Sequence, residues 1–328
     1  MDAALIAAVV AALAFAWTNG FHDAGNSVAT SLATGALTPR VALALAALLN
    51  AVGGLLGVSV AEALSSGVLA VPVDVPGVGL VLAALVAAVG WNLLTWWYGL
   101  PSSSTHALFG GLAGAGLVAG AGVDWGLLDR LVLLPLVASP VIGLVLAWLL
   151  TVVLLRLLRD RPHAETRRRF RIAQTVSASA MALGHGLQDA QKTAAVVVLA
   201  LVAHGDARAG AGVPVWVRLA VALALGAGTA CGGWRIIATL GRRVAPLDPV
   251  GGFTAEVVAA ASLYAAAGFF AAPVSSTHVL VASIVGTGAT TSPRAVRWRQ
   301  VGRIGVTFLL TPLVTGLVAA GVMAATRL

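Results

Sequence analysis

Residues 19 to 27 read NGFHDAGNS, a polar stretch inside an apolar N-terminal segment. Side chains spaced i, i+3, i+4 and i+7 share one face of a helix, and the polar residues of this stretch have that spacing. The spacing recurs in the second half of the chain, again within an apolar segment. The two sets are Asn19, His22, Asp23 and Asn26, and His185, Gln188, Asp189 and Lys192. The sequence therefore predicts a binding site between two polar helix faces.

The rest of the chain has the composition of a membrane protein. Hydrophobic residues make up 59% of the 328 residues and charged residues 10%, and the mean hydropathy is +0.97. Apolar runs of this extent exceed what a soluble core needs. Their Ala, Val, Leu and Gly content is typical of packed helices and not of an outer-membrane barrel. We therefore expect an all-α polytopic membrane protein.

The net charge of +8 does not indicate nucleic-acid binding. In a soluble protein such a charge would favour nucleic acid, but these arginines lie in short loops beside apolar segments, where they determine membrane topology. The single cysteine, Cys231, excludes an intrachain disulfide. The first apolar segment lacks the positive start of a signal peptide, so we expect it to be retained.

The chain divides into two halves with the same order of motifs. PSSSTH at 101–106 has a counterpart in PVSSTH at 273–278, and these turns are separated by nearly the same distance as Asp23 and Asp189. We predict a first transmembrane repeat at 1–155, an Arg-rich cytoplasmic linker at 156–171 and a second transmembrane repeat at 172–328. In duplicated transport proteins the ligand site lies between the repeats, near the midplane of the bilayer.

Each half is predicted to contain a helix broken at its polar stretch and a hairpin that re-enters the membrane at the Ser-Ser-Thr turn. Pro135 and Pro140 predict a kink in the long helix at 127–158. Three full crossings and one hairpin per half would make the two halves inverted. The expected apolar segments are 3–38, 41–60, 78–100, 101–120, 127–158, 172–203, 215–238, 255–272 and a last one ending at 325.

Arginine positions predict the orientation of the chain. With the 156–171 segment in the cytoplasm, most other loop arginines are also inside, as the positive-inside rule requires. Treating the first broken segment as the hairpin instead would move Arg40, Arg235, Arg242 and Arg243 outward, which fits the rule less well. Both alternatives place the two termini outside the cytoplasm.

Asp23 and Asp189 are the main candidates for ion binding, because an ionised residue at mid-membrane costs on the order of 2.5–3.5 kcal/mol. Each aspartate could cap a half-helix at a break. The functional interpretation is that each binds a coupling cation or proton. Asn19, Asn26 and Gln188 would then add the neutral oxygen ligands that Na⁺ and other hard cations prefer.

Histidine and lysine add further titratable groups to the motifs. The histidines could carry protons, although neutral, hydrogen-bonded rings are the simpler interpretation, and no Cys assists them in binding a metal. They are His22, His106, His185 and His278. Lys192 is the only lysine of the chain, and it either pairs with an aspartate or neutralises an anionic substrate.

Two hydroxyl-rich turns predict an anion site. Each follows a proline and opens an apolar helix, so its hydroxyl groups, its free backbone N–H groups and the helix dipole would all favour an anion. N-capping alone would explain one such turn, but two matching turns could surround a tetrahedral oxyanion. The residues are Ser103, Ser104, Thr105, Ser275, Ser276 and Thr277.

Three further features have structural interpretations. Arg235, in a Gly-Gly-Trp-Arg stretch, is expected to be a topology-determining or lipid-facing charge, with a gating role as the alternative. Glu62 and Glu256 lie near predicted helix ends and are expected to face the membrane interface. The aromatic residues of WNLLTWWY at 91–98 are typical of a membrane interface.

The motifs at 19–30, 185–193 and 232–235, together with the two Ser-Ser-Thr-His turns, resemble those of the inorganic phosphate transporter (PiT) family. The resemblance covers nearly the whole chain and is nearest to the short bacterial branch, which lacks a large intracellular domain. It implies inverted repeats, external termini, a homodimeric assembly and symport of phosphate with Na⁺ or H⁺.

By motif position, the resemblance assigns phosphate contacts to the six residues of the hydroxyl-rich turns. It assigns cation or proton contacts to Asp23, Asn26 and Asp189. His22 and Gln188 stand where Na⁺-coupled members have Asn, which weakens the Na⁺ site, and His22 resembles proton-coupled bacterial relatives. The resemblance thus favours H⁺ and leaves Na⁺ as the alternative.

The sequence as a whole predicts a cation-coupled phosphate importer of the cytoplasmic membrane that works by alternating access. We expect it to need no cofactor and to catalyse no reaction. Its expected partners are phosphate, H⁺ or Na⁺, the lipid bilayer and a second copy of the chain. A sulfate permease of the same fold and an anion channel are the alternatives. An intramembrane hydrolase is disfavoured, because neither half has a nucleophile elbow or a metal-ligand signature.

Overall fold

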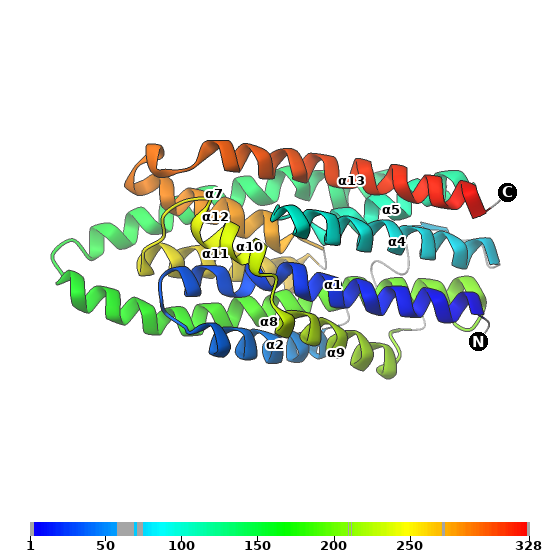
Figure 1. Ribbon diagram of the computed structural model, residues 1–328, viewed down its shortest axis with the longest axis horizontal. Coiled ribbons are helices and arrows are strands. Elements are labelled where there is room, and N and C mark those ends of the chain that lie inside the picture. The colour runs from blue at the N-terminus through cyan, green and yellow to red at the C-terminus, as the bar shows by residue number, and fades with distance from the viewer. Residues whose placement is uncertain are drawn as a thin grey trace.

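The computed structural model describes residues 3–57, 69–70, 75–208, 210, 212–270 and 273–326. This part of the chain is almost entirely helical (Figure 1). The predictions for Glu62 and for the end of the 41–60 segment fall outside the described residues.

Seven of the described helices are long and apolar enough to cross a membrane, which confirms the prediction of an all-α polytopic membrane protein. They are α1 (Ala3–Ala33), α2 (Pro39–Leu56), α4 (Val75–Tyr98), α7 (Leu134–Leu157), α8 (His163–His204), α11 (Pro249–Phe269) and α13 (Trp298–Thr326). The shorter helices are α5 (Ser104–Ala119), α6 (Trp125–Leu128), α9 (Val215–Cys231), α10 (Trp234–Arg242) and α12 (Ser276–Thr291). A π-helical turn η1 (Asp129–Leu133), a 3₁₀ turn η2 (Pro293–Ala295) and an antiparallel pair of short strands, β1 (Leu69–Ala70) and β2 (Gly122–Val123), complete the described elements.

The two polar stretches lie within continuous helices, so the predicted breaks at these positions are wrong. Helix α1 runs unbroken through Asp23, and α8 runs unbroken through Asp189. Polar side chains of both stretches bond to side chains on other elements, so the backbone hydrogen bonds need not open to satisfy them. A break does occur between α9 and α10, which are bent by 67° at Gly232 and Gly233. In the 127–158 segment, the π-helical turn η1 ends just before Pro135.

The Arg-rich segment is mostly helical. Helix α7 ends at Leu157 and α8 begins at His163, so the arginines continue into the exposed first turns of α8. The turn between these two helices lies at one end of the long axis, and both chain termini lie at the other end (Figure 1). A cytoplasmic location of the Arg-rich turn would therefore place both termini on the opposite side of the membrane.

Helices α4 and α5 form one helical hairpin, and α11 and α12 form another. The hairpins enter the bundle from opposite ends of its long axis (Figure 1). At their tips the rings of His106 and His278 stack, with centroids 4.7 Å apart. The two hairpins therefore bring both Ser-Ser-Thr turns to the middle of the molecule.

Small residues let the long helices approach one another closely. Helix α1 packs along α9, α2 along α8, and α5 along α13. A Cβ atom added to Gly114 of α5 would collide with the backbone of Gly316 in α13, and one added to Gly186 of α8 would collide with the backbone of Asn50 in α2. Membrane helices commonly associate through such small residues. The crossing at Gly186 also brings Asn50 next to the polar stretch of α8.

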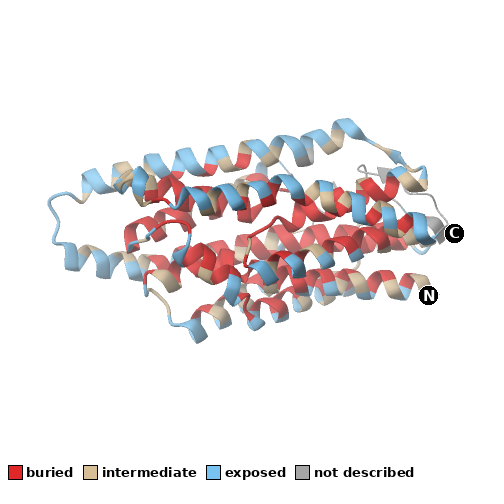
Figure 2. Cartoon of the chain, turned by 45° about the horizontal axis from the view of Figure 1, so that its top comes forward, coloured by how far each residue is buried: buried red, intermediate tan, exposed pale blue. Residues whose placement is uncertain are grey.

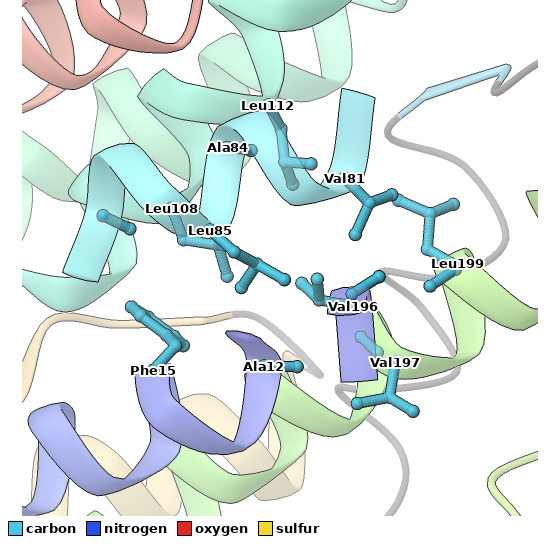
Figure 3. Packing of buried hydrophobic residues seen from close by; sticks show 14 of the residues in the cluster. Ala12, Phe15, Val81, Ala84, Leu85, Leu108, Leu112, Val196, Val197 and Leu199 are labelled. Atoms are coloured by element: carbon cyan, nitrogen blue, oxygen red, sulfur yellow. The ribbon is translucent and has the colours of Figure 1, made fainter. Parts of the chain in front are cut away.

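Apolar side chains fill the interior around the polar stretches. Phe15 of α1, Leu85 of α4 and Leu108 of α5 belong to one buried cluster (Figure 3). The outer helices expose apolar side chains, among them Leu144 of α7 and Leu313 of α13. Exposed residues lie along the outside of the bundle (Figure 2). Exposed apolar faces of this extent are stable in contact with lipid, which agrees with a multi-pass membrane protein.

Candidate functional site

The polar faces of α1 and α8 lie against each other inside the bundle. All eight motif residues are at most 2% exposed. Helices α2 and α4 and the two hairpin tips supply the other polar groups around them. Because these side chains are buried, a ligand could reach them only if the surrounding helices moved.

Asp23 has partners on three helices. Its Oδ1 lies 2.6 Å from Nδ1 of His22, on the same helix, and its Oδ2 accepts a hydrogen bond from Oγ1 of Thr277 at 3.4 Å. Nε2 of His185 lies 3.7 Å from the same Oδ2. The carboxylate of α1 thus contacts both α8 and the start of α12.

Asp189 binds the only lysine of the chain. Nζ of Lys192 lies 2.6 Å from Oδ1 of Asp189, and Asn19 donates to Oδ2 at 2.9 Å. Lys192 also donates to Oγ1 of Thr105 at 2.6 Å and to the backbone carbonyl of Val274 at 3.3 Å. A buried ammonium needs such partners, because an unpaired charge would be costly here. Lys192 therefore joins α8 to both hairpin tips.

His185 lies between the two carboxylates. Its Nε2 is 3.0 Å from Oδ2 of Asp189, and its Nδ1 is 3.2 Å from Oδ1 of Asn50 in α2. Asn50 donates to Oγ1 of Thr229 in α9 at 2.8 Å, and this hydroxyl donates to the carbonyl of Leu225 at 2.9 Å. Sequence reasoning missed Asn50, although a polar amide in an apolar segment is the signal that could have found it.

The hydroxyl-rich turns cap the helices that follow them. Oγ of Ser103 accepts from the backbone N–H of His106, and Oγ of Ser275 accepts from the backbone N–H of His278, each at 3.3 Å. N-capping, the structural interpretation of these serines, is therefore part of their role.

The same turns also contact the polar faces. Nδ2 of Asn26 donates to Oγ of Ser276 at 3.2 Å and to Oγ1 of Thr277 at 2.9 Å. All six serine and threonine residues of the two turns are buried. Because Lys192 contacts both tips, the N-termini of α5 and α12 converge on one buried region, where their dipoles favour negative charge.

Two predicted site residues connect the polar faces to the hairpins. Nε2 of Gln188 donates to the backbone carbonyl of Leu263 in α11 at 3.1 Å. Nε2 of His22 lies 3.1 Å from Oγ1 of Thr95 and 3.3 Å from Oγ of Ser102. Gln188 therefore links α8 to the second hairpin, and His22 links α1 to the first.

Asp23, His185 and Asp189 form a candidate cation site. One ligand atom of each lies within 4.8 Å of the others, and all three residues are buried. The sequence grouped Asn26 with the two aspartates. In the structure His185 is the third member of this cluster, while Asn26 shares the hydroxyl of Thr277 with Asp23.

Glu256 is 0% exposed, so the prediction that it faces the membrane interface is wrong. It accepts hydrogen bonds from the hydroxyl groups of Thr30 in α1 and Ser177 in α8, and from Nε2 of Gln174 at 3.3 Å. Helix α11 begins at Pro249, so Glu256 lies nearly two turns inside it. The donors come from helices far away in the sequence, and for that reason the pattern around Glu256 does not reveal them.

Glu256→Ala is expected to lower the melting temperature of the purified protein. The substitution leaves three donors on α1 and α8 without their buried acceptor, at a cost of about 1–3 kcal/mol for each unpaired group. Glu165→Ala, in the exposed start of α8, is the matched control, because its ion pair is open to solvent and contributes little. Equal melting temperatures for the two variants would show that the Glu256 network does not stabilise the fold.

Arg235 and the aromatic residues of α4 form a cluster beside the first hairpin tip. The guanidinium carbon of Arg235 lies 4.5 Å from the ring centroid of Trp97 and 5.2 Å from that of Trp96. The ring of Trp96 also lies 4.9 Å from that of Phe21. Arg235 and Trp97 are exposed, as predicted for a lipid-facing charge and an interfacial aromatic residue, whereas Trp96 is half-buried.

Long apolar helices around a buried, charged centre, with two hairpin tips meeting beside it, define a membrane transport protein. The model of the phosphate transporter family matches residues 19–319. A probable low-affinity inorganic phosphate transporter of Mycobacterium tuberculosis (strain ATCC 25618 / H37Rv) is 43% identical over 319 residues, which cover 96% of this chain and 76% of the relative. One of Bacillus subtilis (strain 168) is 38% identical over 305 residues, or 92% of this chain and 91% of the relative.

A solved structure described as the sodium-dependent phosphate transporter has a similar fold. Its TM-score is 0.79, with 22% sequence identity and coverage of 99% of both chains. The chain therefore belongs to the phosphate transporter family, which confirms the family suggested by the motifs. The proteins of this family are transporters and not enzymes.

Proposed function

We propose that the chain imports inorganic phosphate across the cytoplasmic membrane in symport with protons, by alternating access. The observation that carries this proposal is the convergence of two capped helix N-termini with two aspartates and one lysine in a single buried region. Hydroxyl groups and helix N-termini suit a tetrahedral oxyanion. The carboxylates suit a cation or a proton.

The two carboxylates would make anion binding depend on a cation. With Asp23, Asp189 and Lys192 charged and the histidines neutral, the centre carries one net negative charge. A phosphate ion brought to the hydroxyl-rich turns is then repelled in this low-dielectric region unless a cation or proton neutralises a carboxylate. Phosphate and cation would therefore bind together, as symport requires.

The hydrogen bonds around His185 support the proton as the coupling ion. The hydroxyl of Thr229 donates to the backbone of α9, so its oxygen accepts from Asn50, and the Asn50 carbonyl oxygen faces Nδ1 of His185. Nδ1 then donates, and Nε2 carries a lone pair unless a second proton is present. Nε2 lies 3.0 Å from an oxygen of Asp189 and 3.7 Å from one of Asp23. A proton on Nε2 or on a carboxylate removes the repulsion between the Nε2 lone pair and the carboxylate oxygen, so this cluster suits a proton site.

Na⁺ is the alternative coupling ion. The solved transporter of similar fold is described as sodium-dependent. Asp23, Asn26 and Asp189 offer oxygen atoms of the kind that hard cations prefer. The imidazole of His185 between the carboxylates is a poorer ligand for such a cation, and it favours the proton.

The proposal includes an orientation and a repeat structure. A cytoplasmic Arg-rich turn places both termini outside, because the turn lies at one end of the long axis and both termini lie at the other (Figure 1). The order long helix, shorter helix, hairpin, long helix occurs twice along the chain, which supports inverted repeats at 1–155 and 172–328 joined by 156–171. We expect lipid around the apolar outer faces and a homodimer as the assembly.

Uptake of labelled phosphate into proteoliposomes tests the proposal. An inward proton gradient without Na⁺ is expected to stimulate uptake several-fold, and a Na⁺ gradient at equal pH is expected to have no effect. Stimulation by Na⁺ alone would show that Na⁺, and not the proton, is the coupling ion. Flux that follows the phosphate gradient and ignores both cations would indicate an anion channel. Equal competition by sulfate would indicate a general permease for tetrahedral oxyanions.

A further inference from the structure

The two halves of the site have equivalent residues at the same spacing, and one of these pairs differs in charge. Asn26 follows Asp23 by three positions, and Lys192 follows Asp189 by three positions. Each reaches the threonine of a hairpin turn. Asn26 donates to Oγ1 of Thr277 at 2.9 Å, and Lys192 donates to Oγ1 of Thr105 at 2.6 Å. We call Asp23 and Asn26 the arm of Asp23, and Asp189 and Lys192 the arm of Asp189. The arm of Asp23 has a neutral amide where the arm of Asp189 has an ammonium.

The ammonium of Lys192 is surrounded in the way that a bound hard cation would be. Its three partners among the described residues are a carboxylate oxygen of Asp189 at 2.6 Å, the hydroxyl oxygen of Thr105 at 2.6 Å and the carbonyl oxygen of Val274 at 3.3 Å. An ammonium has three N–H donors, so these oxygen atoms engage all of them. Carboxylate, hydroxyl and carbonyl oxygens are also the ligands of hard metal ions. Lys192 is therefore held as a cation by the protein and has no N–H left for an anion in this structure.

The arm of Asp23 has oxygen atoms and no such permanent charge. Nδ2 of Asn26 is taken up by Ser276 and Thr277, and Thr277 donates to Oδ2 of Asp23. In the part of the chain that the structure describes, the buried Oδ1 of Asn26 has no hydrogen-bond partner. Within the described ranges, the charged or titratable neighbours of Asp23 are His22 on its own helix and His185 on α8. This arm can thus take an exchangeable cation or proton.

We infer that Lys192 is a tethered cation that permanently fills one of two similar cation positions, and that it sets how many exchangeable cations accompany each phosphate. The inference rests on the proposed function. With asparagine at both positions, the two carboxylates would need one more exchangeable cation before an anion could bind. With Lys192 in place, only the arm of Asp23 exchanges its cation with solution. Lys192 then determines the coupling ratio and is not itself a phosphate ligand.

Linkage between phosphate and cation binding tests this inference on the purified full-length protein. The affinity for labelled inorganic phosphate is measured by equilibrium dialysis over a range of pH without Na⁺, and over a range of Na⁺ at fixed pH. The slope of log affinity against log cation concentration counts the cations taken up with phosphate. The ionisation of phosphate itself contributes equally to every variant, so differences in slope report the protein.

Two single variants are expected to change the slope in opposite directions, and their combination is expected to leave it unchanged. Lys192→Asn should increase the slope by one, and Asn26→Lys should decrease it by one. The double variant, which moves the ammonium to the other arm, should return the slope to the wild-type value. Lys192→Arg keeps the charge and should keep the slope even if the affinity falls. Size-exclusion profiles identify folded variants. The slope of any one folded charge-changing variant is sufficient to test the role of Lys192 as a tethered cation.

Unchanged slopes in the folded charge-changing variants would overturn the inference while leaving the proposed function intact. Loss of phosphate binding in Lys192→Asn at every cation concentration, with binding retained in Lys192→Arg, would overturn it too, because Lys192 would then be an anion ligand. A wild-type protein whose phosphate binding responds to neither pH nor Na⁺ would refute the proposed function, and the inference with it.

Discussion

Asp23→Asn is expected to lower cation-coupled phosphate uptake by roughly 30- to 4,000-fold, because the coupling cation or proton then loses its buried carboxylate partner, and removing one partner of a buried charge pair costs about 2–5 kcal/mol. Asparagine keeps the size of the side chain and can still bond to His22. It has no negative charge, so it cannot be neutralised by a proton or attract a cation, and phosphate binding loses its link to the gradient. The measurement is the initial rate of uptake into proteoliposomes that contain equal amounts of folded protein.

Asp189→Asn should show a similar loss of uptake. It should also lower the melting temperature, because the ammonium of Lys192 loses its carboxylate partner in a buried place. Asp206→Asn is the matched control: Asp206 lies after the end of α8, where its side chain is 46% exposed, and uptake should not change. Near-normal uptake in both Asp23→Asn and Asp189→Asn would refute the assignment of the coupling site.

Joint replacement by Thr105→Val and Thr277→Val is expected to raise the phosphate KM by at least about 10- to 100-fold. Valine keeps the shape of threonine and removes the hydroxyl groups that meet Lys192 and Asn26 at the two hairpin tips. Hydrogen bonds to charged groups contribute about 1.5–3 kcal/mol each, which corresponds to this range for a single bond to phosphate. The measurement is uptake over a range of phosphate concentrations at a fixed proton gradient.

Thr287→Val is the matched control for the joint variant. Thr287 is also buried in α12, but its hydroxyl donates to the carbonyl of Ile284 within its own helix. The phosphate KM of this control should stay close to that of the wild type. An unchanged KM in the joint variant would show that phosphate does not bind at the hairpin tips, even if the aspartates couple transport to a cation.

Much of the architecture could be predicted from local patterns. Apolar length predicts the membrane helices, and the i, i+3, i+4, i+7 spacing shows that Asp23 and Asp189 lie on polar faces. Two matching Pro-x-Ser-Ser-Thr-His turns predict two hairpins with capped N-termini. The structure shows both hairpins, their serine caps and the burial of the polar faces.

The predicted helix breaks failed for a physical reason. A polar group in a membrane helix needs a partner, and a break would supply one from the backbone. In the structure the partners are side chains of other elements instead, such as Asn19 for Asp189 and Thr277 for Asn26. The helices can therefore stay continuous, which the sequence around each motif does not reveal.

Glu256 and Asn50 also have partners that the sequence around them does not reveal. Glu256 is near the predicted start of a helix, where exposure at the interface is the usual expectation, yet α1 and α8 cover it with hydroxyl and amide donors. Asn50 is an isolated amide in an apolar segment, yet it bonds to Nδ1 of His185. The close crossing of α2 and α8 at Gly186 creates that contact.

The sequence by itself determined which residues are polar within the membrane, which faces they share and where the hairpins turn, because these properties follow from helical periodicity and local composition. Only the tertiary structure decided which faces meet, that Lys192 is held by oxygen atoms from Asp189, Thr105 and Val274, and that His185 lies between the carboxylates. Except for the pairs within α8, those contacts join segments far apart in the chain, and their energies depend on distances that periodicity does not specify.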